Sequence, residues 1–208
     1  RCMYTGIYRD YEDDYTGNWV MKQLVDFKDK LKSSRALILD LRDNPGGELR
    51  FAGEMSHYLC PDNDCFIHDF YVRTNPDAMK LNNHYNIPDK ITLQDTDIPD
   101  LKHLTKSFKD ECVIDTVNYD KNIYILTNTA TVSSAELLIY KLKKHPNVKI
   151  IGDNTGGALK YCRPRGVVCP HSHIAIFAGT IGMPFIEPNF ELHGFTPDIK
   201  CIDGQDAF

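Results

Sequence analysis

The stretch Asn122-Ile-Tyr-Ile-Leu-Thr-Asn-Thr-Ala-Thr-Val-Ser-Ser-Ala-Glu136 passes directly from a strand pattern to a helix pattern. Residues 123–126 form a short apolar, β-favouring run bounded by polar residues, which predicts a buried strand. From Ser133 onward, apolar residues recur at helical spacing, which predicts a helix over residues 133–144. Short hydroxyl and amide side chains between the two patterns favour a turn and a helix N-cap. Ser133 is therefore expected at the first turn of a helix that follows a buried strand.

A serine at such a corner has two interpretations. The N–H groups at a helix start are unpaired and the helix dipole favours negative charge there, so Ser133 could be a nucleophile whose neighbours hold an oxyanion. Ser133 could also be no more than an N-cap residue. This stretch by itself favours the N-cap interpretation.

Strand and helix patterns alternate along most of the chain. A near-continuous apolar run at residues 36–41 is typical of a strand buried in a parallel sheet, and it leads into Arg42-Asp-Asn-Pro-Gly-Gly47. Alternation with short loops predicts an α/β fold with a largely parallel sheet. The other expected elements are strands at 3–8, 148–151 and 174–178 and helices at 19–31 and 49–59.

Residues 60–120 interrupt this alternation. The segment is polar and irregular and has prolines at positions 61, 76, 88 and 99. We expect one core domain over residues 1–208, in which this segment is an insertion that caps one end of the sheet. Long, weakly structured segments inside a compact domain are more often functional than idle.

Composition narrows the class of protein. The chain has 208 residues and a net charge of −5, which gives no reason to expect nucleic acid as a partner. No apolar run approaches the length of a membrane span, no signal peptide is recognisable, and no pattern suggests a metal or other cofactor. Because the chain opens with Arg1, without an initiator Met and at the start of an expected strand, we expect that an upstream segment is missing.

The seven cysteines leave two interpretations open. Cys60/Cys65 and Cys162/Cys169 are close in sequence and could each close a small disulfide loop in an oxidising compartment. Buried free thiols are the alternative for all seven. On the first interpretation we expect an extracytoplasmic location, in the cell envelope or secreted.

Four stretches in this order resemble motifs of the tail-specific (C-terminal processing) serine peptidases, a family that includes the core of the tricorn protease. Residues 37–47 resemble the family's Asp-Leu-Arg-x-Asn-x-Gly-Gly, and residues 131–136 resemble its Thr-Ala-Ser-Ala-Ser-Glu motif around the nucleophile. Residues 152–157 are similar to Gly-x-x-Thr-x-Gly, and residues 191–198 are similar to Glu-x-x-Gly-Val-x-Pro-Asp. Each match is weak alone, whereas four in order are a strong signal.

The resemblance implies a crotonase/ClpP-like α/β core and a set of site residues. Ser133 matches the nucleophile. The N–H group of Gly46 or Gly47, together with that of Ser134, would form the oxyanion hole, since glycines allow a substrate to approach the backbone closely. The alternative for Gly46-Gly47 is a plain tight turn. We expect Asp40 and Arg42 to be structural residues that fix this loop.

The chain departs from the family pattern at the general base, which a serine needs in order to lose its proton near neutral pH. The processing peptidases have a lysine directly after Gly-x-x-Thr-x-Gly, where this chain has Ala158. The tricorn-like branch has a histidine on the first strand, where this chain has Gly6. Lys160 is then the candidate base, provided that a desolvated pocket lowers its pKa, and Glu191 matches a supporting acid. Other candidate bases are His171, His173 and His193.

Two functions, and a variant of the first, follow from these residues. The first is a serine endopeptidase of the C-terminal processing type that cleaves unstructured peptides or protein tails, bound as an added strand. The second is a peptidase-like module that has lost its base and binds a peptide or an apolar ligand, which the retinoid-binding relatives of this fold illustrate. A third possibility is that the chain is part of a serine peptidase whose base lies upstream of Arg1 or on a partner subunit. A homo-oligomer is compatible with all three.

Overall fold

The computed structural model describes residues 25–47, 49–63, 69–73, 92–95, 101–105 and 116–201. Two compact units divide the chain. The first contains residues 1–67, 108–158 and 189–208, and the second contains residues 68–107 and 159–188. The expected strand at 3–8, including Gly6, lies outside the described residues. The expectation of a single core domain with one insertion stays a prediction.

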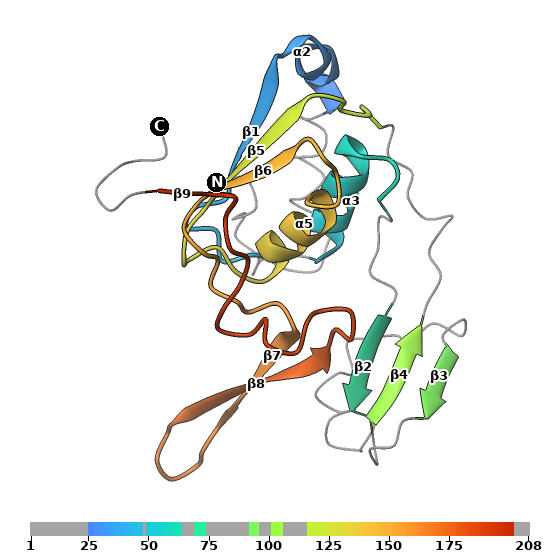
Figure 1. Ribbon diagram of the computed structural model, residues 1–208. Helices are drawn as coiled ribbons and strands as arrows, with labels where there is room; N and C mark the ends of the chain where they lie inside the picture. Colours follow the sequence, from blue (N-terminus) through green and yellow to red (C-terminus); the bar gives the residue numbers. More distant parts are fainter. Residues whose placement is uncertain are drawn as a thin grey trace. The chain divides into compact units, whose positions relative to one another are not determined.

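A parallel four-stranded sheet forms the centre of the first unit (Figure 1). The strand order is β1-β5-β6-β9, and every neighbouring pair is parallel. The expected α/β fold with a largely parallel sheet is therefore confirmed. The strands are β1 (Ala36–Asp40), β5 (Asn122–Thr127), β6 (Val148–Gly152) and β9 (Ile199–Lys200).

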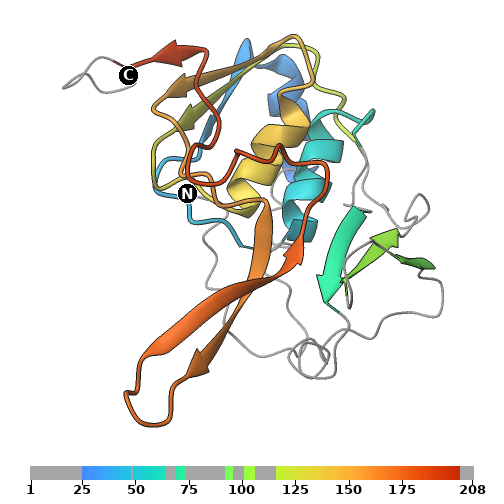
Figure 2. The ribbon, with the colours of Figure 1, turned by 60° about the horizontal axis from the view of Figure 1, so that its bottom comes forward.

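Two helices lie side by side against this sheet in both views (Figures 1 and 2). They are α3 (Leu49–Leu59) and α5 (Ser134–Leu142), and their bounds match the expected helices closely. Burial of apolar side chains between helix and sheet is the main favourable term in folding such a layer. The core that they share with the sheet includes Tyr58, Leu59, Ile123, Ile125, Leu137, Leu138, Ile139 and Leu142, all almost fully buried.

The helix expected at 19–31 is described only at its end. There α2 spans Lys28–Ser33 and buries none of its residues, and Phe27 on the expected apolar face is 45% exposed. The expected apolar face is therefore wrong at this position. The segment that ends the expected insertion also differs, because Val117 and Tyr119 are buried and donate their N–H groups to Tyr58 O and Leu59 O. Residues 116–120 thus belong to the core rather than to the insertion.

The second unit contains a five-stranded antiparallel sheet with the order β3-β4-β2-β8-β7. The strand expected at 174–178 is present as β8, whereas β2, β3, β4 and β7 were missed where the sequence alternation is weak. They lie in the segment expected to be irregular and in the basic loop after Lys160. Charged residues, a proline and a glycine in β7 hide the apolar alternation there. The bounds are β2 (Asp69–Arg73), β3 (Thr92–Asp95), β4 (Leu101–Thr105), β7 (Tyr161–Val168) and β8 (Ala175–Gly182).

Of the two interpretations of the cysteines, the disulfide interpretation is wrong wherever the structure describes the residues. Among the described residues, Cys60, Cys162 and Cys169 form no disulfide. Cys162 lies within β7 and Cys169 directly follows it, so their Cα atoms are about 20 Å apart at the usual rise of a strand, whereas a disulfide needs less than about 7 Å. Cys65 lies outside the described residues.

Candidate active site

Ser133 occupies the N-cap of α5 in a conformation that serine rarely adopts. Its φ is 59° and its ψ is −125°, and its side chain is half-buried. A non-glycine residue at positive φ is uncommon, and strain of about 1–3 kcal/mol persists only where the surroundings enforce it. An ordinary N-cap residue has β-region dihedrals, so this geometry is more than capping requires.

Glu136 supplies the enforcing contact. Its side chain has no exposed surface, and one carboxylate oxygen, Oε2, accepts the Ser133 N–H at 3.0 Å and the Ala158 N–H at 2.9 Å. The other oxygen, Oε1, accepts the Gly157 N–H at 2.9 Å and the Thr155 hydroxyl at 2.5 Å. Hydrogen bonds to a charged acceptor are stronger than neutral ones, and four of them satisfy this buried carboxylate.

Thr155 extends this network to the tail of the chain. The same Thr155 hydroxyl oxygen accepts the Phe195 N–H at 2.8 Å, and the Thr155 N–H donates to Phe195 O at 3.1 Å. The Leu192 N–H donates to Gly157 O at 2.8 Å. Two of the four motifs found in the sequence therefore meet at the carboxylate of Glu136, and a third, at residues 191–198, is bonded to it through Thr155 and Gly157.

The remaining motif, the loop after β1, contacts Ser133 from the other side. Asn44 O accepts the Val132 N–H at 3.1 Å, and the Thr131 hydroxyl donates to Leu41 O at 2.7 Å. A Cβ atom at Gly46, whose φ is +88°, would come within 2.7 Å of Ser133 Cβ. Only glycine fits at this position, because any side chain would collide with the serine loop.

Asn44 decides which glycine N–H can face a substrate. Its Oδ1 atom accepts the Gly46 N–H at 2.9 Å, so that group is already used. Among the described residues, none accepts a hydrogen bond from the N–H of Gly47 or from that of Ser134, which is the first residue of α5. These two N–H groups have the chemistry that an oxyanion hole requires.

Asp40 and Arg42 form a two-pronged ion pair at the start of this loop. Arg42 donates Nε–H to Asp40 Oδ1 at 2.9 Å and Nη2–H to Oδ2 at 2.8 Å. The hydrogen bonds from Arg42 lower the pKa of Asp40 from its ordinary value, against an opposing effect of burial. The pair holds the chain direction between β1 and the Gly46-Gly47 turn, as a structural role requires.

The expected catalytic groups are only partly brought together. Ala158 and Ser133 donate to the same oxygen of Glu136, so the position where the processing peptidases have their lysine is a close neighbour of the serine. Glu191 and His193 lie in the same unit, in the tail loop that contacts Gly157; the His193 ring nitrogen Nδ1 is 3.0 Å from Glu191 O. Lys160, His171 and His173 belong to the second unit, and both histidines are exposed.

Glu136, Thr155 and Asn44 are functional residues that the sequence analysis did not assign. Each lies inside a quoted motif, so the motif positions other than serine and glycine were the available signal. A buried carboxylate or amide needs partners, and apart from the Thr155 hydroxyl the partners here are backbone groups that no side-chain pattern reveals.

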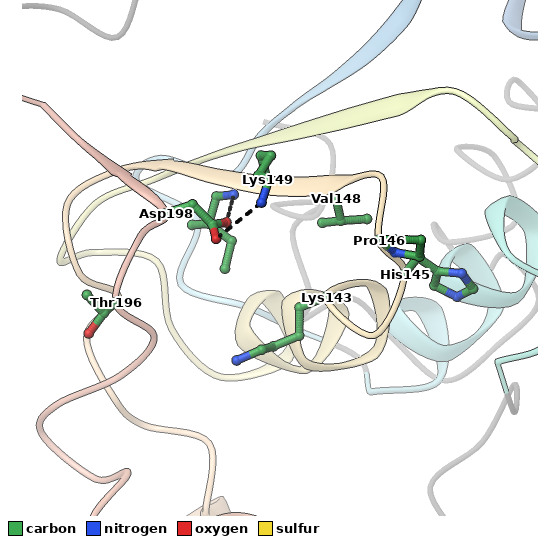
Figure 3. A pocket seen from close by; sticks show the side chains of 8 residues that line it. Lys143, His145, Pro146, Val148, Lys149, Thr196 and Asp198 are labelled. Carbon is green, nitrogen blue, oxygen red and sulfur yellow. Dashed lines mark hydrogen bonds and ion pairs between the residues drawn. The ribbon is translucent and has the colours of Figure 1, made fainter.

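A surface hollow of about 220 Å³ lies elsewhere in the first unit (Figure 3). It is lined by Lys143 and His145 after α5, by β6 and by Asp198, whose Oδ1 is 3.8 Å from Lys149 Nζ. Because Ser133 is at the opposite end of α5, this hollow is separate from the candidate active site. Among the described residues, no group of three or more His, Cys, Asp or Glu side chains is placed to hold a metal ion. Within the same part of the chain, no helix has the length and apolarity to cross a membrane.

Comparison with known proteins agrees with this geometry. Residues 12–201 match the family model described as Peptidase family S41. The chain therefore belongs to peptidase family S41, a family of serine peptidases, which confirms the resemblance to the tail-specific peptidases. No curated protein sequence matches the chain.

Solved structures of low sequence identity share the fold. A protein described as an S41 protease from Bacteroides fragilis has 19% identity and a TM-score of 0.57, covering 94% of this chain and 44% of that chain. Mature CPAF complexed with lactacystin has 15% identity and a TM-score of 0.59, and the match covers 96% of this chain and 45% of the CPAF chain. The photosystem II D1 C-terminal processing protease has 15% identity and a TM-score of 0.50, covering 91% and 40%. The chain thus spans less than half the length of these three structures.

Proposed function

We propose that this chain is a serine endopeptidase of the C-terminal processing type, with Ser133 as the nucleophile. The observation that carries the proposal is the strained backbone of Ser133 in an S41 chain, held by the buried Glu136. Near it lie the Gly47 and Ser134 N–H groups, which have no acceptor among the described residues. A helix cap would need neither the strain nor the close approach of Gly46.

The reaction follows from these groups. Ser133 Oγ attacks the scissile carbonyl carbon while a base takes its proton, and the carbonyl oxygen becomes an oxyanion that the Gly47 and Ser134 N–H groups stabilise. The intermediate collapses to an acyl-enzyme, and the departing amine takes the proton from the base. Water then attacks the ester with the help of the same base, which releases the acid product and restores the serine.

Lys160 is the base in this proposal, and Glu191 is its supporting acid. Lys160 is half-buried and follows Ala158 by only two residues. A lysine in this role must be neutral before it accepts the proton, so its desolvation in the assembled site is part of the proposal. His193, on the loop that contacts Gly157, is the alternative base.

A second candidate function has its own supporting observation. Ala158 stands next to Ser133 where the processing peptidases have lysine, and alanine has no proton-accepting group. A chain with no other base would bind a peptide or an apolar ligand without cleaving it.

The substrate class follows from the nature of the site. Peptides and unfolded protein tails are the proposed partners, because an extended segment can add to a sheet edge and present its carbonyl to the serine. An extracytoplasmic location stays a prediction, and because Cys60, Cys162 and Cys169 form no disulfide within the described part of the chain, the disulfide argument for it is lost.

Covalent labelling with a fluorophosphonate from pH 6 to pH 10 tests the proposal, with the adduct located by mass spectrometry. Labelling is expected at Ser133, rising with pH, and is lost in Ser133→Ala and Lys160→Ala. Ser134→Ala is the matched control, because it removes a neighbouring hydroxyl that has no partner and keeps the backbone N–H.

The outcomes separate the candidates. Labelling that survives Lys160→Ala but not His193→Ala makes His193 the base. Absence of labelling at every pH in a folded protein refutes the peptidase proposal for this chain and favours the binding module.

A further inference from the structure

The hairpin formed by β7 and β8, residues 161–182, is called the arm below. β8 pairs with β2 only through Ile181 and Gly182, so most of the arm is a ribbon of two strands (Figures 1 and 2). Its loop is closed by hydrogen bonds from the Cys169 N–H to Ile174 O and from the His173 N–H to Cys169 O. A two-stranded hairpin is marginally stable in water when nothing packs on it.

Apolar side chains occupy both faces of the ribbon. Val167 is paired with Ile176, and residues paired directly across an antiparallel ladder share a face. Val168 follows on the opposite face, where Phe177 packs over Gly166. Six of the eleven exposed large apolar side chains of the described residues lie on or at the end of the arm, each 56–68% exposed: Tyr161, Val167, Val168, Ile174, Ile176 and Phe177.

We propose that the arm is a dimerisation element that packs onto a second copy of this chain. Six side chains at this exposure present about 600 Å² of surface, at about 100 Å² each. In a two-fold dimer each copy gives one arm and receives one, so contacts that cover both faces of each arm bury about 1,200 Å² per copy, above the roughly 800 Å² per partner of a stable interface, whereas contacts on one face alone bury about 600 Å². The proposed interface therefore covers both faces of the arm.

Charge favours a second copy as the occupant. Residues 159–186 contain three of the chain's 24 Lys and Arg residues and none of its 29 Asp and Glu residues, so the remainder has a net charge of −8. The basic residues Lys160, Arg163 and Arg165 precede the apolar side chains of the arm, and residues 166–182 contain no Lys, Arg, Asp or Glu. An acidic body and a basic, apolar arm on one chain are complementary between two copies, and such complementarity speeds and orients association.

The test is the oligomeric state of the full chain by sedimentation velocity over a hundredfold concentration range. Wild type is expected to dimerise, and the double variant Val167→Ser/Ile176→Ser is expected to dissociate at least tenfold more readily. Ile38→Ser is the matched control, since Ile38 is also on a strand and is 55% exposed against 57% for Ile176. Phe177→Ser, on the other face of the arm, is a second variant in case the first does not fold.

Hydrogen exchange localises the contact: arm amides are expected to be protected at dimer concentrations and to exchange faster on dilution. A wild-type chain that is monomeric throughout overturns the proposal, and so does a dimer that both arm variants leave unchanged. Co-sedimentation of a monomer with phosphatidylcholine–phosphatidylglycerol vesicles, lost in the arm variants, also overturns it, because the arm would then bind membranes. None of these outcomes depends on whether Ser133 is a nucleophile.

Discussion

Replacement of Glu136 by glutamine tests whether one buried carboxylate organises the site. The glutamine oxygen can keep the Ser133 and Ala158 N–H groups, and its NH2 group then faces the Thr155 hydroxyl and the Gly157 N–H. The Gly157 N–H loses its acceptor, which costs about 1–3 kcal/mol for a buried donor. The two bonds that remain become neutral, which costs about 1 kcal/mol each.

The expected loss for Glu136→Gln is therefore about 3–5 kcal/mol of the free energy of unfolding, a large part of the total for an ordinary domain. Glu136→Ala leaves all four donors without the carboxylate, so a larger loss is expected. Urea unfolding followed by far-UV circular dichroism measures both variants. Glu187→Gln makes the same chemical change at an exposed position and is expected to stay within about 0.5 kcal/mol of wild type.

The labelling rate of Ser133 gives a second readout under conditions where the variant is folded. A drop in labelling at unchanged circular dichroism is expected, because the Ser133 backbone loses the contact that enforces its strained dihedrals. A Glu136→Gln variant that unfolds like wild type and labels at the same rate would refute the role assigned to this network.

Three further changes have defined outcomes. Ala158→Lys places an amine beside Ser133 and is expected to raise fluorophosphonate labelling at least tenfold if the chain has no working base; unchanged labelling indicates that a base is already present. Arg42→Ala is expected to cost under about 1 kcal/mol, because the pair with Asp40 is partly exposed. Since the pKa of Asp40 is lowered in the folded protein, the stability that the pair contributes is present above pH 3.8 and disappears as the pH falls through the lowered pKa. The unfolding free energies of wild type and Arg42→Ala, measured in urea, should therefore converge in acid. A difference that persists in acid contradicts the assignment. Burial raises the pKa of Cys60 from 9.0 to about 11, so at pH 8 its thiolate fraction is about 100-fold below that of a thiol with the ordinary pKa. Iodoacetamide should therefore modify Cys169, which is only half-buried, well before Cys60. Equal rates for the two cysteines would contradict that burial.

The parallel sheet and its two helices could be predicted because their signals are local. The apolar runs at β1, β5 and β6 and the helical spacing of α3 and α5 each lie within one element, and the bounds of α3 were predicted correctly. In the second unit only β8 was predicted, from the apolar run at residues 174–178. The other strands could not be predicted, since their alternation is weak and their pairing joins residues far apart, such as Tyr71 and Gly182.

In the candidate site, too, residues with a local signal were predicted and residues that depend on distant segments were not. Ser133, Gly46 and Gly47 were found because each must be that residue type for a local reason of geometry or chemistry. Glu136 and Thr155 were missed as site residues because their importance lies in backbone N–H groups supplied by other segments. The base was not identified, because the two usual motif positions hold Gly6 and Ala158 and the sequence gives no distance from Ser133 to Lys160 or His193.

The link from Ser133 through Glu136 and Thr155 to Phe195 joins residues that are made at different times. On a ribosome Ser133 is synthesised before Thr155 and Phe195, so a nascent chain has the serine before it has the segments that hold it. We therefore expect Ser133 to take up its strained backbone only after Phe195 has been added. A chain truncated between Ser133 and Phe195 would keep the serine and lack the segment that binds Thr155.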